Sequence, residues 1–225
     1  MGCAPAKADD VPAPKPPPIR FEHDMMVRFH MHENFDLLRA IEKLLIRGKL
    51  DDAKTLARAM ANAPDEPGMA AFAAYATRVR ERALAVANAT TAEDAVRRET
   101  ELAEACANCH HAASVLPELS EPPRIPPDQP TITARMARHV WATDRIWEGL
   151  VIDDDTAWRQ GLEVLAATPL PSTTLPADRA RDAKQLQRLA DRARRAVPTS
   201  KLGDRAKDYA EILATCARCH QAAAR

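Results

Sequence analysis

Two five-residue stretches decide how this 225-residue chain is read: Cys106-Ala-Asn-Cys109-His110 and Cys216-Ala-Arg-Cys219-His220. Both lie in runs rich in Ala, Leu, Glu and Arg, which are good helix formers. In a helix, residues three and four positions apart share one face. The two thiols and the imidazole of each stretch should therefore point the same way.

Two proline-rich segments divide the chain. Residues 1–20 contain six prolines and are expected to form an extended tether, and residues 114–130 contain another six and are expected to form a linker. The blocks between them, 21–113 and 131–225, have helical composition. The linker predicts that each block is a separate bundle with its own core.

Each block is predicted to contain four helices, so the expected fold is all-α, with two tandem four-helix bundles. Gly48 is expected to end the first helix, and proline or aspartate clusters separate several of the others. The predicted helices span residues 21–47, 50–63, 69–88 and 91–113 in the first block, and 131–152, 154–168, 177–197 and 201–223 in the second.

The two blocks are repeats of one another. An offset of 110 residues superimposes the last two helices of the blocks, including Cys106 on Cys216. An offset of 105 superimposes the first two, for example Ile41 on Ile146. The difference falls in a proline-rich loop, where an insertion costs little. The chain is therefore interpreted as a tandem duplication.

The C-x-x-C-H pattern is typical of covalent haem attachment, in which two cysteines form thioether bonds and the adjacent histidine binds iron. It predicts two haem c groups, one at Cys106 and Cys109 and one at Cys216 and Cys219. His110 and His220 are the predicted iron ligands. The alternatives are one zinc ion bound by four thiolates, and a thioredoxin-like redox pair, although no βαβ pattern surrounds either motif.

A C-x-x-C-H close to the end of the last of four helices resembles the class II c-type cytochromes, the cytochrome c-prime group and its methionine-ligated relatives. The resemblance covers residues 21–113 and 131–223. It implies that the iron ligand opposite the histidine comes from the first helix of each unit. It also implies electron transfer, or the binding of nitric oxide or carbon monoxide where the sixth position is open.

Met31 and Met136 are the only ligand-capable pair that the first helices share in register, and both lie on apolar faces. They are the expected sixth ligands, with packing in the core as the alternative role. His30 and His139 are the competing ligands. The three tryptophans all belong to the second block and are expected to pack around its haem.

These patterns predict a di-haem cytochrome that transfers single electrons between redox partner proteins and is not an enzyme, because no nucleophile and base constellation is present. The alternative is a gas-binding or gas-sensing haem protein. The chain has 32 basic and 32 acidic residues, so its charge gives no case for nucleic-acid or anionic-membrane binding.

The N-terminal residues bear on location. Gly2-Cys3 followed by a Pro/Ala tether looks like the mature start of a bacterial lipoprotein, which predicts a lipid anchor at Cys3; a free thiol is the alternative. Haem c is attached on the periplasmic side in bacteria, so the predicted location is the periplasm. No stretch approaches the roughly 18 apolar residues of a membrane-spanning helix.

Overall fold

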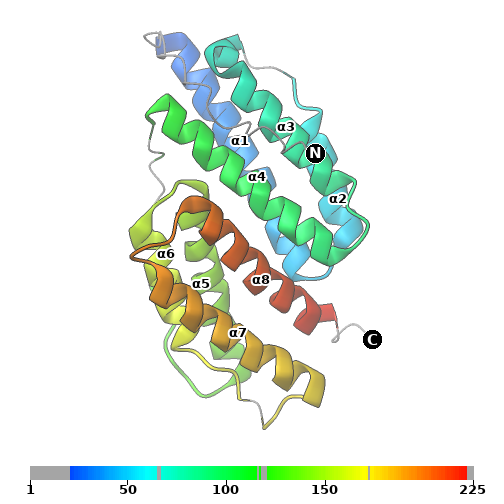
Figure 1. Ribbon diagram of the computed structural model, residues 1–225, viewed down its shortest axis with the longest axis vertical. Helices are drawn as coiled ribbons and strands as arrows, with labels where there is room; N and C mark the ends of the chain where they lie inside the picture. Colours follow the sequence, from blue (N-terminus) through cyan, green and yellow to red (C-terminus); the bar gives the residue numbers. More distant parts are fainter. Residues whose placement is uncertain (1–20, 65–66, 116, 118–120, 172, 222–225) are drawn as a thin grey trace, which may run out of the picture.

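The computed structural model describes residues 21–64, 67–115, 117, 121–171 and 173–221. These residues form eight α-helices and one short 3-10 helix, with no strand among them (Figure 1). The prediction of an all-helical chain is confirmed. Residues 1–20, and with them the proposed lipid anchor at Cys3, lie outside the described residues.

The helices follow the predicted order, and most ends agree within two residues. The exception is the third helix, which begins four residues late because residues 67–72 form the 3-10 helix and Phe72 provides no side-chain cap. The elements are α1 (Phe21–Ile46), α2 (Leu50–Ala61), η1 (Pro67–Phe72), α3 (Ala73–Ala87), α4 (Ala92–Ala113), α5 (Ile132–Val151), α6 (Asp155–Ala166), α7 (Ala177–Ala196) and α8 (Leu202–Gln221).

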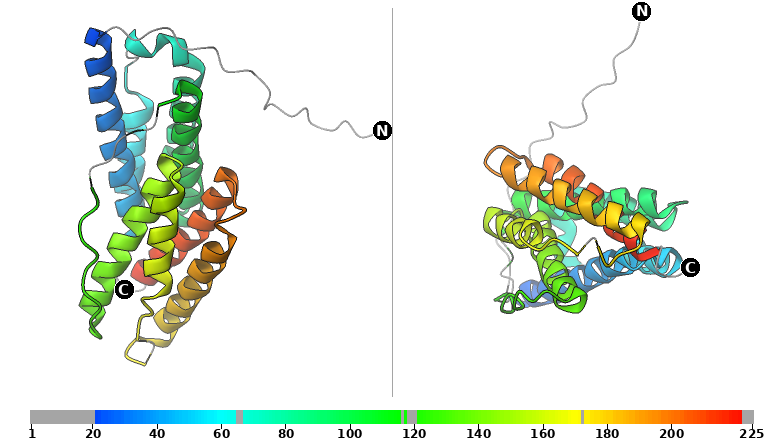
Figure 2. Two further views of the ribbon diagram at one scale, coloured as in Figure 1. Left: turned by 90° about the vertical axis from the view of Figure 1, so that its left-hand side faces the viewer. Right: turned by 90° about the horizontal axis from the view of Figure 1, so that it is seen from below.

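Within each repeat, consecutive helices pack against one another and the last helix returns to the first. The first repeat, α1 to α4, occupies one end of the molecule, and α5 to α8 occupy the other (Figures 1 and 2). None of the described helices has the length and hydropathy needed to cross a membrane.

The two repeats share a single core. Helices α4 and α8, which carry the two C-x-x-C-H motifs, lie side by side and antiparallel between the repeats (Figure 1). Buried side chains of both repeats, from Leu38 and Leu102 to Trp147 and Leu213, belong to one continuous cluster. The prediction of separate cores is therefore wrong, because α4 and α8 are buried both by their own repeat and by the other one.

The linker does not hold the repeats apart. Its described part runs along α5, where the Trp141 indole donates a hydrogen bond to the carbonyl of Pro123 at 2.7 Å. The Arg138 guanidinium donates to the carbonyl of Pro126, also at 2.7 Å. Proline lacks a backbone N–H but keeps its carbonyl, so a proline-rich segment can still be fastened to a helix in this way.

Contacts between the repeats are related by an approximate two-fold axis. Tyr209 of α8 donates a hydrogen bond to Glu42 of α1, and at the equivalent positions Trp147 of α5 donates to Glu99 of α4 at 3.2 Å. The ion pair between Arg39 and Asp144, at 2.7 Å, joins two residues that the offset of 105 makes equivalent to each other. The duplicated halves thus associate as the subunits of a symmetric dimer do.

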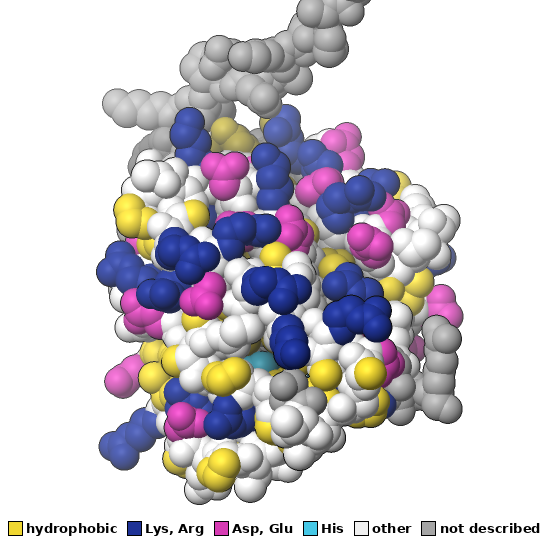
Figure 3. Space-filling view, turned by 60° about the horizontal axis from the view of Figure 1, so that its bottom comes forward, with side chains coloured by type: hydrophobic (Ala, Val, Ile, Leu, Met, Phe, Trp, Pro, Cys, Tyr) yellow, Lys and Arg dark blue, Asp and Glu magenta, His cyan; other side chains and the backbone are white. Residues whose placement is uncertain are grey.

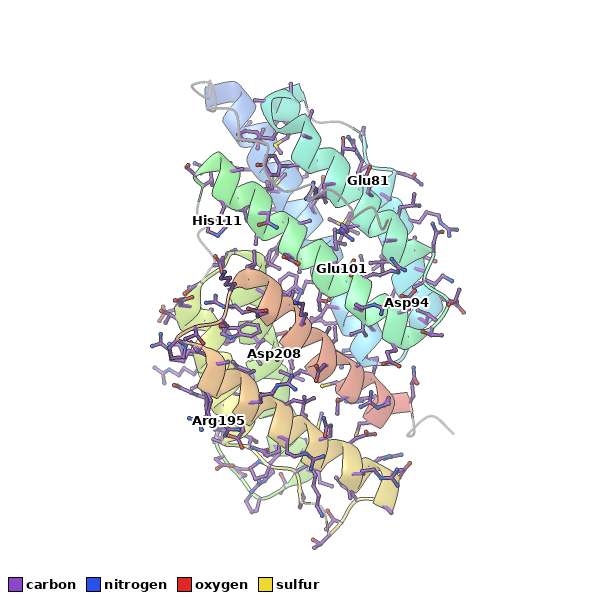
Figure 4. All side chains as sticks on the ribbon, in the orientation of Figure 1. Glu81, Asp94, Glu101, His111, Arg195 and Asp208 are labelled. Carbon is purple, nitrogen blue, oxygen red and sulfur yellow. The ribbon has the colours of Figure 1, made fainter. Side chains whose placement is uncertain are left out.

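The same symmetry relates the turns after the first helix of each repeat. Gly48 and Asp153 are equivalent and both have positive φ, 71° and 54°. His111 at the end of α4 contacts Asp153 at 2.6 Å, where the first repeat meets the second (Figure 4). Its counterpart Gln221 lies so close to Gly48 that a Cβ there would be 2.7 Å from Cγ of Gln221. Glycine is required at this position by both conformation and space.

Helices α5 and α6 approach closely at Gly149. A Cβ added there would lie 2.7 Å from the backbone Cα of Trp158, which cannot move without shifting α6. We therefore expect Gly149→Ala to lower the free energy of unfolding by about 1–3 kcal/mol or more, as overpacking does. Gly203→Ala is the matched control, since a Cβ there meets only the flexible end of Glu104 at 3.3 Å. Equal melting temperatures for the two variants would contradict the close approach.

Candidate functional site

The second C-x-x-C-H motif lies at a cavity. Residues of α8, Cys216, Cys219 and His220, are each partly buried on one face of the helix and line a cavity of about 200 Å³. Their spacing of three and four residues places them on that common face, as the sequence predicts.

Four helices and a loop form this cavity. It brings Met136 and His139 of α5 to the same space as Cys216, although Met136 and Cys216 are 80 residues apart in the chain. In the second repeat the structure thus brings the candidate residues of α5 and α8 to one cavity. The remaining lining residues are Lys43, Ile46, Arg47, Val140, Thr143, Asp144, Leu170, Asp182, Ala183, Leu186 and Thr215.

The cavity is apolar inside and charged at its edge. Ile46, Val140 and Leu186 supply apolar walls, whereas Lys43 and Arg47 supply cations from α1 of the other repeat. Figure 3 shows a histidine side chain visible among hydrophobic side chains on this end of the molecule, with Lys and Arg side chains gathered beside it. Two acids, Asp144 and Asp182, also line the cavity, and they pair with Arg39 and Arg218. An apolar group that carries carboxylates could bury its body here and meet Lys43 and Arg47 with its acidic edge.

The histidines at the two motifs favour the neutral form. Burial lowers the pKa of His220, and the charges of Arg179 and Arg47 lower it further. Burial also lowers the pKa of His110. A neutral imidazole has a nitrogen lone pair available, which is what a metal ligand needs. The imidazoles are therefore in the form that can bind iron.

The two candidate ligands on α5 differ in how free their donor atoms are to bind iron. His139 is buried, and its Nε2 lies 2.6 Å from the carbonyl of Thr168, to which it donates a hydrogen bond. That nitrogen would have to leave the carbonyl before it could bind iron. Met136 lines the same cavity and is partly buried. Met136 is thus the freer ligand.

The first repeat places its motif at the junction with α5. Cys106, Cys109 and His110 are partly buried on α4, and His110 lies against the backbone of Val151 without a hydrogen bond of normal geometry. The equivalent of Val151 in the first repeat is Ile46, which lines the cavity beside His220. Each motif thus adjoins the first helix of the other repeat.

The two candidate ligands on α1, Met31 and His30, lie in different surroundings. Met31 is partly buried, as its counterpart Met136 is. His30 instead faces a groove formed with Ala63, in which its Nε2 accepts a hydrogen bond from the Asn34 amide at 2.9 Å. That groove includes none of the motif residues of the first repeat, so His30 has no structural support as a ligand.

The thiols of both motifs are held neutral. Burial raises the pKa of Cys106 and of Cys216 to about 12, and that of Cys109 to about 11. Within the described part of the chain, no three His, Cys, Asp or Glu side chains are grouped so that they could hold a metal ion. The arrangement gives no support to a single four-thiolate zinc site.

The tryptophans do not surround the cavity, contrary to the sequence-based expectation. Trp147 and Trp158 are fully buried and Trp141 is 7% exposed, yet none of them lines it. Trp147 instead packs edge-on to Phe35 of the other repeat, with ring centroids 4.9 Å apart. The indole N–H needs a buried acceptor, and Glu99 at the repeat interface provides it.

Two buried acids beside the motifs were not anticipated. Glu42 and Glu99 are both fully buried at the repeat interface. Burial raises the pKa of Glu42 to about 7, with the Tyr209 hydrogen bond opposing and the charge of Asp144 adding to the rise. Burial and then the charge of Glu42 raise the pKa of Glu99 well above its usual range. One feature of the sequence does indicate that Glu99 lies near the motif: it stands seven residues before Cys106, on the same helix face.

No protein-family model, curated protein or solved structure matches this chain. The resemblance to class II cytochromes consequently depends on the two motifs and on the helix order.

The buried Glu42 makes stability depend on pH. Its pKa is about 7 when folded and 4.5 when free, so the folded chain binds more protons between these values and loses stability as the pH rises through them. We expect Glu42→Gln to remove this loss, which amounts to about 3 kcal/mol. The two proteins should have similar free energies of unfolding near pH 4.5, and the variant should be the more stable at pH 8, measured by urea titration. A difference that does not change with pH would contradict the assignment.

Proposed function

We propose that this protein is a di-haem c-type cytochrome that carries single electrons between redox partner proteins. The observation that carries this proposal is the cavity of the second repeat. It has the two cysteines and the histidine of the motif on α8 and a second candidate iron ligand, Met136, on α5.

The residues of the chain fit the proposed group. Cys216 and Cys219 would hold it through thioether bonds, and Cys106 and Cys109 would do the same in the first repeat. His220 and His110 would bind the two irons, and Met136 and Met31 would provide the second protein ligand of each. Lys43 and Arg47 line the cavity and would pair with propionates. Bound haem supplies a one-electron couple whose potential is set by its axial ligands and surroundings.

The protein itself supplies attachment, burial and charge. Covalent attachment keeps the cofactor in place through oxidation and reduction, and the shared core of the two repeats excludes water around it. The resemblance to class II cytochromes agrees with this function. We propose no substrate chemistry for the chain and place it in the periplasm, where haem c is attached in bacteria, with Cys3 as a lipid anchor.

Removal of one cysteine pair should halve the haem content. We expect Cys106→Ala/Cys109→Ala to retain one covalent haem per chain, because the cavity of the second repeat is made without these residues. Pyridine haemochrome absorbance measures the content, and Cys3→Ser is the matched control with two haems. A wild-type protein that is colourless and contains zinc would refute the proposal.

Substitution of the methionines tests the sixth ligands. We expect Met136→Ala to abolish, at one haem, the weak ferric band near the red edge of the visible spectrum that reports iron–thioether bonding. Met31→Ala should do so at the other haem. His139→Ala should leave the band intact, since His139 is engaged by Thr168. Absence of the band from the wild type would rule out methionine at both sites and leave histidine ligation or an open, gas-binding position.

A further inference from the structure

Two carboxyl groups are buried where the repeats meet, and each has one unpaired oxygen. Oε1 of Glu42 accepts the hydrogen bond of Tyr209, and Oε1 of Glu99 accepts that of Trp147. Oε2 of each glutamate is buried with no hydrogen-bond partner. A bare carboxylate oxygen in such a place costs several kcal/mol, so the pair is the natural place for a proton.

Of the two cations that act on Glu42, one is paired with other acids and the other lines the cavity. Arg39 of α1 pairs with Asp144 at 2.7 Å and approaches Glu148 at 3.5 Å. Lys43, the other cation acting on Glu42, lines the cavity at the motif of α8. From the remaining packed elements, Glu42 faces the acid Asp144 of α5 and the phenol of Tyr209 of α8, and Glu99 faces Glu42 itself. Neither glutamate has an ion-pair partner of its own among the described residues.

The pair lies between the two predicted attachment sites. Glu99 and Tyr209 stand seven residues before Cys106 and Cys216 and so share their helix faces. The charge of Glu99 raises the pKa of Cys106, and the charge of Glu42 raises that of Cys216. A charge at either motif would in turn act on the glutamate, because such coupling is reciprocal.

We propose that Glu42 and Glu99 form a proton-binding site that is coupled to the electron occupancy of the haems. When a one-electron donor protein reduces a ferric haem, one proton moves from solvent water to the pair. When an acceptor takes the electron, the haem returns to the ferric state and the proton returns to water. This inference depends on the proposed function, because it requires the haems.

The two glutamates have different roles within the pair. Glu99 is the group that more strongly favours the neutral form, because burial and the charge of Glu42 raise its pKa well above the usual range. Glu42, with a pKa of about 7, is the group that exchanges. Asp144 acts on Glu42 and also lines the cavity, so an acidic group connects the surroundings of Glu42 with the cavity.

The direction in which the midpoint potential changes with pH follows from the charge of the haem. Reduction removes one positive charge from a haem, which raises the pKa of a nearby carboxyl group. The reduced protein then binds more protons than the oxidised one around pH 7, and the midpoint potential falls as the pH rises. The limiting slope is about 59 mV for each tenfold change in proton concentration.

The test is a pH series of midpoint potentials on the holoprotein, measured by spectroelectrochemistry from pH 5 to pH 9. In the wild type we expect the midpoint potential of one haem to fall as the pH rises. In Glu42→Gln most of this dependence on pH should be lost. Glu99→Gln should keep a slope, because the inference assigns the exchanging proton to Glu42 and not to Glu99. Glu163→Gln, at an exposed position on α6, is the matched control and should behave as the wild type does.

A second variant and a second measurement keep the test decisive if Glu42→Gln disturbs the fold. Tyr209→Phe removes a hydrogen bond that lowers the pKa of Glu42 and should move the sloping region to higher pH. The reduced-minus-oxidised infrared difference spectrum should contain a carboxylic-acid C=O band that disappears in Glu42→Gln. Absence of haem would refute the proposed function. Two intact haems whose pH slope and infrared band persist in Glu42→Gln would overturn this inference alone.

Discussion

The contact of α4 with α8 is the constraint on which the rest of this structure depends. These helices carry both C-x-x-C-H motifs, and their antiparallel packing joins two repeats into one hydrophobic core. A four-helix unit of about 90 residues buries only part of its apolar surface. Association of the two units lets each complete the core of the other, as subunits do in an obligate dimer.

This packing explains why the interface contains polar groups at equivalent places. The first repeat contributes both glutamates, Glu42 and Glu99, and the second repeat contributes the aromatic O–H or N–H that each of them accepts. Position 42 is equivalent to 147, and position 99 to 209, so at each pair the first repeat has the acceptor and the second has the donor. The two halves have therefore diverged in sequence while the two hydrogen bonds stay related by the two-fold axis. Buried polar groups of this kind specify one arrangement of packed helices, because a shifted register would leave the carboxyl groups without their donors.

Because the repeats associate, each candidate site is also contacted by residues of the other repeat. Ile46 and Arg47 of the first repeat line the cavity of the second, and Val151 of the second repeat adjoins His110 of the first. For an electron carrier, such an arrangement means that the charge state of one site acts on the other through buried groups, where the effective dielectric constant is low. A tandem of independent domains on a proline-rich tether would have no such coupling.

The sequence by itself determined the helices, the duplication and the shared helix face of each C-x-x-C-H motif, because these depend on local composition, proline and glycine breaks, and spacings of three and four residues. It also indicated that Met136 and the second motif belong together. Tertiary structure alone decided that the repeats share one core, that the linker lies along α5, that Trp147 serves the interface and that Glu42 and Glu99 are buried together. A charged residue next to an apolar stripe is ambiguous in a sequence, since its burial depends on what another helix, more than 100 residues away in the chain, packs against it.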